Sequence, residues 1–145
     1  MNDPVANDPF DLQRFVDAQN PVYEQVRAEL RRGQKAGHWM WFIFPQLRGL
    51  GYSHMAAKFG ISSRQEAEAY LAHPILGPRL KECTRLVNLV KGSTIDEIFG
   101  HPDDLKFRSS MSLFASVAAR DTQVFKDALQ KYFGGELDDF TLQRL

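Results

Sequence analysis

The sequence has a single cysteine, Cys83, no long apolar run, and no excess of charge of either sign. One cysteine excludes an internal disulfide and a cysteine-cluster metal site. The longest apolar run, residues 39–44, is far shorter than the ~20 residues that span a bilayer. Lysine plus arginine and aspartate plus glutamate number 18 each, so the basic footprint of nonspecific nucleic-acid binding is missing. We therefore expect a cytoplasmic protein with no metal or cofactor and no membrane partner, and the sequence carries no strong signal for a nucleic-acid partner.

The composition is typical of a folded globule. The 145 residues are 43% hydrophobic and 12% aromatic, which suits one domain with an aromatic-rich core. Residues 1–7 show no periodicity and are predicted to be a flexible N-terminal tail. Residues 8–145 contain no linker, repeat or low-complexity tract, and they are predicted to form a single helical domain. Nothing in the pattern sets the oligomeric state.

The most informative stretch is residues 38–46, His-Trp-Met-Trp-Phe-Ile-Phe-Pro-Gln, which holds both tryptophans and two of the eleven phenylalanines. Periodicity alone cannot distinguish a buried strand from a buried helical turn in so short a run. No second convincing strand exists to pair with it, and an isolated strand would leave its backbone groups without partners. We therefore predict a short helix that ends before Pro45, because proline disfavours helix at the preceding residue.

Capping residues, prolines and glycines mark the other helices. Apolar residues follow these signals at helical spacing, so the prediction is an all-α fold of about eight short helices around an aromatic-rich core. The start signals are Asp8-Pro9, Asn20-Pro21, Ser53, Ser62-Ser63, Pro74, Ser93 or Thr94, Pro102, Asp121 or Thr122, and Asp138 or Asp139.

Several ordered motifs resemble one family of bacterial proteins. They are the 38–46 stretch with Gly49 and Gly51, Glu66-Ala67, Tyr70-Leu71, His73-Pro74, Leu76-Gly77, Arg79-Leu80, Asp104 with Lys106, Ser109-Ser110-Met111, Leu113-Phe114, Gly134-Gly135 with Asp138, and Thr141-Leu142. Together they resemble the domain of unknown function family 1810, whose members are sometimes labelled calpastatin. The resemblance implies a compact all-helical domain and carries no activity. Calpain inhibitors of that name are disordered, whereas this composition is that of a packed globule.

A cluster of ring, cation and amide side chains near the central stretch suggests a ligand pocket. Indole faces stack on flat ligands, and a lysine or histidine can meet a phosphate or carboxylate. Arg79, on a later helix, could reach such an anion bidentately, or it could form a surface ion pair. The alternative for the tryptophans is the core, and for the lysine it is solvent. The candidate ligand-binding residues are Lys35, His38, Trp39, Trp41, Gln46 and Arg79.

The candidate catalytic residues are His38, Asp104 and Lys106. A carboxylate close to a lysine could take part in acid–base chemistry. The alternative is that Asp103 and Asp104 complement the dipole at a helix N-terminus.

The sequence leaves two classes of function open. The first is binding, or hydrolysis, of a nucleotide or ADP-ribose-like small molecule in an aromatic-walled polar pocket. The second is a non-catalytic protein-interaction module, which predicts an exposed apolar patch. Whether the protein is an enzyme is not decided at this level.

Overall fold

Ten α-helices and no strand make up the described part of the chain, residues 7–117 and 121–145 of the computed structural model. This confirms the all-α prediction, with ten helices in place of about eight. The residues of the tail predicted for 1–7 lie outside the described part, except for Asn7. The helices are α1 Gln13–Gln19, α2 Tyr23–Arg32, α3 Met40–Ile43, α4 His54–Phe59, α5 Arg64–Ala72, α6 Leu76–Leu89, α7 Ile95–Phe99, α8 Asp103–Val117, α9 Gln123–Phe133 and α10 Asp139–Arg144.

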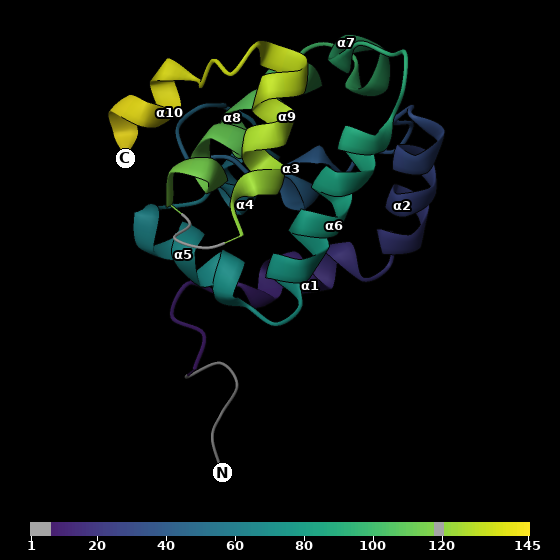
Figure 1. The fold of residues 1–145 in the computed structure, drawn as a ribbon. Coiled ribbons are helices and arrows are strands. Elements are labelled where there is room, and N and C mark those ends of the chain that lie inside the picture. The colour runs from purple at the N-terminus through teal and green to yellow at the C-terminus, as the bar shows by residue number, and fades with distance from the viewer. Residues whose placement is uncertain (1–6, 118–120) are drawn as a thin grey trace.

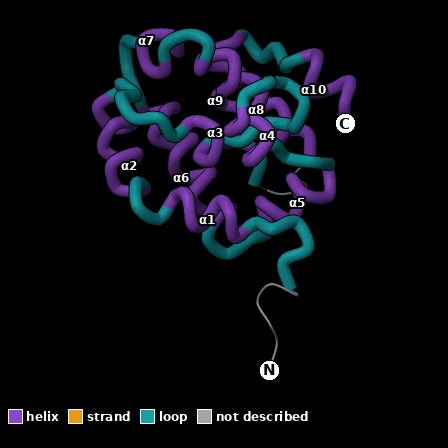
Figure 2. Tube along the Cα trace, turned by 180° about the vertical axis from the view of Figure 1, so that it is seen from behind, coloured by secondary structure: helices purple, strands orange, loops and turns teal. Residues whose placement is uncertain are grey.

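The long helices α6 and α8 organise the packing. Helix α8 contacts α5, α7, α9 and α10, while α6 contacts α2, α5 and α9. Figure 1 shows α9 beside α8 and the short α10 at the edge of the molecule. Helix α3 lies near the middle of the molecule in Figure 1 and also in Figure 2, which shows the molecule from behind. No helix among the described residues combines the length and apolar character needed to cross a membrane.

The central stretch forms the short helix that the sequence predicts, and it ends before Pro45. Buried aromatic rings surround it. Phe44 packs edge-on against Phe107 and Phe99, with ring centroids 5.1 and 5.7 Å apart, and Phe42 packs edge-on against Phe59 at 5.3 Å. Such contacts add roughly 0.5–1.5 kcal/mol each beyond simple burial. The aromatic-rich core is therefore built around α3.

A buried amide ties α3 to its neighbours. Gln19, at the end of α1, is 1% exposed and donates hydrogen bonds to the carbonyl of Phe42 at 2.7 Å and to the hydroxyl oxygen of Tyr70 at 3.1 Å. Its oxygen accepts from Arg79 Nη1 at 3.3 Å. Because buried polar groups must be satisfied, this network fixes α1, α3, α5 and α6 relative to one another.

The capping signals are placed correctly at several helix starts. Ser53, Ser63 and Asp138 accept hydrogen bonds from backbone amides in the first turns of α4, α5 and α10. Thr94 forms a reciprocal capping box with Glu97. At the N-terminus the start lies later than Asp8-Pro9 indicates. The Asp8 carboxylate accepts from the amides of Leu12 and Gln13 across an intervening turn, so α1 begins at Gln13.

Candidate functional site

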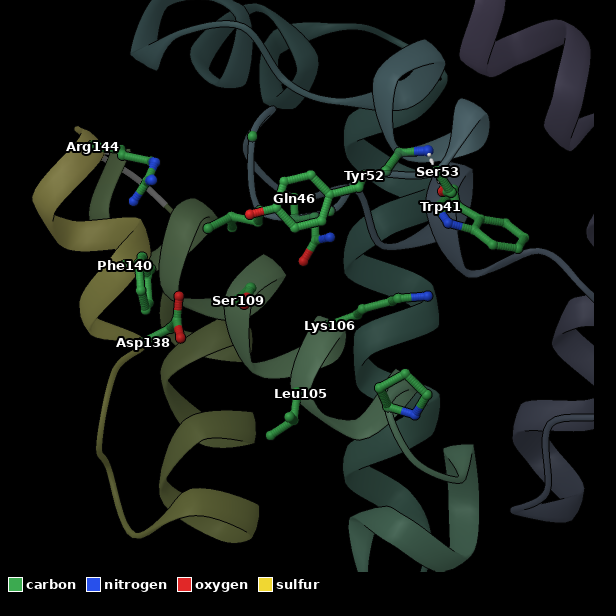
Figure 3. Close-up of a pocket in the computed structure, with 15 residues that line it drawn as sticks. Trp41, Gln46, Tyr52, Ser53, Leu105, Lys106, Ser109, Asp138, Phe140 and Arg144 are labelled. Carbon is green, nitrogen blue, oxygen red and sulfur yellow. Dashed lines mark hydrogen bonds between the residues drawn. The ribbon is translucent and has the colours of Figure 1, made fainter.

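A cleft of about 520 Å³ lies between α3, the loop that follows it, α8 and α10. This volume falls within the roughly 300–1,000 Å³ range of ligand pockets. Figure 3 shows Trp41 and Lys106 towards one end, with Phe140, Asp138 and Arg144 at the other. The lining residues are Trp41, Gln46, Gly49, Leu50, Gly51, Tyr52, Ser53, Ala56, Pro102, Leu105, Lys106, Ser109, Asp138, Phe140 and Arg144.

Apolar side chains at the cleft are unusually exposed. Tyr52 is fully exposed, Phe140 is 61% exposed and Leu105 is 50% exposed. Tyr52 stands on a loop between Gly51 and Ser53, and Figure 3 shows its ring over the middle of the cleft near Gln46. Exposed apolar residues that form one contiguous patch, unlike single ones, can mark a binding surface. The cleft therefore offers flat apolar faces to a ligand.

Two cations line the cleft. Lys106 Nζ lies 3.2 Å from Asp103 Oδ1 and 4.9 Å from the centroid of the Trp41 ring. The Arg144 guanidinium lies 5.2 Å over the ring of Phe140, and it has no carboxylate within ion-pair distance in the described part of the chain. The cleft is therefore suited to a ligand that carries negative charge.

Two polar side chains in the cleft have unused hydrogen-bonding capacity. The side chains of Gln46 and Ser109 form no hydrogen bond with any other described residue. The carboxylate of Asp138 is in use, since it caps α10 by accepting from the amide and hydroxyl of Thr141 at 3.0 and 2.7 Å. An amide and a hydroxyl with open capacity could fix the orientation of a polar ligand.

Helix α8 also positions α10 at the far wall. The Ser112 hydroxyl accepts from the amide of Asp138 at 2.8 Å. Arg108 donates to the carbonyls of Glu136 and Leu137 at 3.1 and 3.2 Å. These bonds fix the chain just before α10, and thereby the places of Phe140 and Arg144.

A buried carboxylate anchors the turn that leads into α3. Glu29 is 3% exposed, and its Oε1 accepts from the amides of Ala36 and Gly37 and from Trp39 Nε1 at 2.7, 2.9 and 3.0 Å. Gln25 donates to the other oxygen at 2.8 Å. Burial would raise the pKa of this carboxyl, but the four donors outweigh it and lower the pKa to about 2. Glu29 is therefore charged at neutral pH and holds this turn.

The structure brings three of the sequence candidates together and separates the others. Trp41, Gln46 and Lys106 line the cleft. Lys35 is linked to them indirectly, because its ammonium lies 2.9 Å from Asp103 Oδ2, on the same carboxylate that pairs with Lys106.

The remaining candidates lie outside the cleft. Trp39 is 2% exposed, so it is a core side chain and offers no face to a ligand. Arg79 lies over the ring of Tyr23 at 4.5 Å. Asp104 pairs with His101 Nδ1 at 3.0 Å. His38 is exposed and is not among the lining residues.

The sequence reasoning did not select Tyr52, Ser109, Phe140 or Arg144. Tyr52 carried a signal, since this aromatic residue directly follows Gly51 and lies close to Gly49. Phe140 and Arg144 carried a weaker one, because an aromatic and a cation four residues apart share a helix face.

The lining residues include no recognisable pair of nucleophile and base. Among them there is no histidine or cysteine, and neither Ser53 nor Ser109 donates a hydrogen bond to a carboxylate or imidazole of the described residues. Ser53 instead accepts the Ala56 amide at 3.1 Å as the cap of α4. A nucleophilic mechanism needs a hydroxyl or thiol within hydrogen-bond reach of a base. The cleft can hold an anion and a ring, but it shows no such pair.

Comparison with known proteins confirms the resemblance noted from the motifs. The family described as "Protein of unknown function (DUF1810)" matches residues 9–145. The crystal structure of the conserved hypothetical protein Rv1873 from Mycobacterium tuberculosis is similar over 95% of this chain and 98% of that chain, with 61% sequence identity and a TM-score of 0.93. No curated protein matches. The chain belongs to the DUF1810 family, and these findings indicate no function.

Proposed function

Within this family of unknown function, we propose that the cleft binds a small anionic molecule with a planar ring, of the nucleotide or ADP-ribose class. The observation that carries the proposal is the presence of Lys106 and Arg144 in a cleft that is also lined by the rings of Trp41, Tyr52 and Phe140. Two cations favour phosphate groups, and indole or phenol rings favour a flat base. We propose binding rather than hydrolysis, because no catalytic pair lines the cleft.

Each lining residue has a role in this proposal. Arg144 and Lys106 hold the anionic group or groups, and Gln46 and Ser109 orient polar atoms of the ligand. Trp41 and Tyr52 provide ring faces on the walls of the cleft. The roles of Lys35 and Asp103 are indirect, since they position Lys106.

Isothermal titration with AMP and ADP-ribose tests the proposal. We expect measurable binding of at least one of them. Replacing Arg144 with alanine should weaken binding by roughly 10- to 100-fold, since a charge-assisted hydrogen bond contributes about 1.5–3 kcal/mol. The matched control is Arg85→Ala, because Arg85 is an exposed arginine on α6 outside the cleft. A dissociation constant above about 1 mM for both ligands would contradict the proposal.

The second candidate function is a non-catalytic protein-interaction module. The observation in its favour is that Tyr52, Leu105 and Phe140 at the cleft, and Leu142 beside it on α10, are exposed large hydrophobic residues. Light scattering over a range of protein concentrations provides a first test. If self-association occurs through this surface, Phe140→Asp should abolish it and Leu89→Asp, at an exposed leucine on α6, should not.

A further inference from the structure

We propose that Lys106 is a movable cation that couples anion binding to ring binding in the cleft. This inference rests on the proposed function and adds a condition on the ligand. In the structure Lys106 covers one face of Trp41. An anionic group would draw the ammonium away and so uncover that face for a ring. The ligand class is therefore a molecule that carries the anion and the planar ring together.

The first step of the argument is that the indole face is already occupied. Lys106 Nζ lies 4.9 Å from the centroid of the Trp41 ring, which is within the roughly 6 Å reach of a cation–π contact. A flat ligand that stacked on this face would have to displace the ammonium. A neutral ring has no negative charge to draw the ammonium away from this contact, whereas a phosphate does.

The second step is that Lys106 can move away from Asp103 without leaving that carboxylate unpaired. Asp103 is shared by two lysines, with Oδ1 3.2 Å from Lys106 and Oδ2 2.9 Å from Lys35. The Lys35 side chain is only 10% exposed, whereas that of Lys106 is 26% exposed. When Lys106 moves, Asp103 therefore keeps the more buried of its two cations. A carboxylate with a single cationic partner would be left as an unpaired charge, and the movement of that partner would then be unfavourable.

Coupling of this kind is reciprocal. If phosphate increases the affinity for a ring by a given factor, the ring increases the affinity for phosphate by the same factor. A ring and an anion joined in one molecule gain this coupling free energy once, in addition to their separate contacts. A nucleoside alone or phosphate alone would bind weakly.

The test measures how phosphate changes the binding of a neutral ring. Titrations of adenosine are carried out by calorimetry with and without saturating inorganic phosphate, and AMP serves as the linked ligand. In the wild-type protein we expect phosphate to increase adenosine affinity by at least about fivefold. Lys106→Ala removes the ammonium that covers the Trp41 face and responds to phosphate, so adenosine affinity should become independent of phosphate. Lys106→Arg should restore the coupling, since it returns a cation to the same place.

Lys126→Ala, at an exposed lysine of α9 outside the cleft, is the matched control and should keep the wild-type coupling. If the wild-type protein binds AMP but adenosine affinity does not change with phosphate, the coupling is refuted while the proposed function stands. Coupling that persists in Lys106→Ala likewise refutes the role of Lys106. If neither AMP nor ADP-ribose binds, the proposed function and this inference fail together.

Discussion

The buried carboxylate of Glu29 allows a quantitative prediction for Glu29→Gln. Glutamine preserves the size of the side chain and removes its charge, so it imitates the protonated acid. The fold lowers the pKa of Glu29 from 4.5 to about 2. At 1.36 kcal/mol for each pKa unit, the native state favours the charged form by roughly 3 kcal/mol. We therefore expect Glu29→Gln to reduce the free energy of unfolding by about 3 kcal/mol at neutral pH.

The stability lost in Glu29→Gln must depend on pH, and the loss must become smaller as pH falls. A carboxyl whose pKa is lowered by folding contributes stability above its unfolded-state pKa, and that stability is lost as pH falls through the folded-state pKa. For Glu29 the window lies between pH 4.5 and about 2. As the wild-type carboxyl takes up its proton, the stability difference between wild type and Glu29→Gln should shrink. Urea denaturation at pH 7, 4 and 3, followed by tryptophan fluorescence, measures this difference.

The matched control is Glu24→Gln on the same helix. The side chain of Glu24 is 80% exposed and pairs with Arg27 at the surface, so its neutralisation should change stability by less than about 0.5 kcal/mol. The reasoning is refuted if Glu29→Gln costs less than about 1 kcal/mol at pH 7. It is also refuted if the cost is the same at pH 7 and pH 3.

Three further predictions concern single positions in the fold. A Cβ at Gly77 would overlap the backbone carbonyl of Leu71, so Gly77→Ala should cost at least about 2 kcal/mol in a thermal or chemical melt, and an unchanged melting temperature would contradict this. Burial raises the pKa of the Cys83 thiol to about 12, so iodoacetamide at pH 8 should label it slowly in the native protein and rapidly in urea; equal rates would contradict its burial. Thr94→Ala removes the capping box with Glu97 and should cost about 1 kcal/mol, whereas Thr94→Ser should restore most of the loss.

The fold class could be predicted because its signals are local. Helix caps such as Ser53 and Thr94 act on amides three residues away, and Pro45 restricts only the residue before it. The Asp8-Pro9 signal predicts too early a start for α1, which begins at Gln13, for the same reason. The Asp8 side chain bonds to amides four and five residues on, and Asp11 has a φ of 51°, a turn that the Asp-Pro pair does not encode.

The site could be predicted only in part, because its two walls are distant in sequence. Trp41, Gln46 and Lys106 were selected from chemistry near the central stretch and α8. Arg144 reaches the same cleft only because Arg108 and Ser112 fix the chain that leads into α10. Those bonds join groups 26 to 29 residues apart. No periodic pattern in a single sequence reports such pairings.

The two tryptophans show how one short helix can serve both the core and the cleft. In the sequence they are equivalent, two residues apart among the same apolar neighbours. In a helix of 3.6 residues per turn, side chains two positions apart point in roughly opposite directions. Trp39, at the N-cap of α3, is 2% exposed and donates its indole N–H to Glu29, while Trp41 faces the cleft under Lys106. Because Glu29 fixes the first indole, the orientation of the second follows from the helix between them. Loosening the Glu29 anchor should therefore disturb the cleft as well as the core.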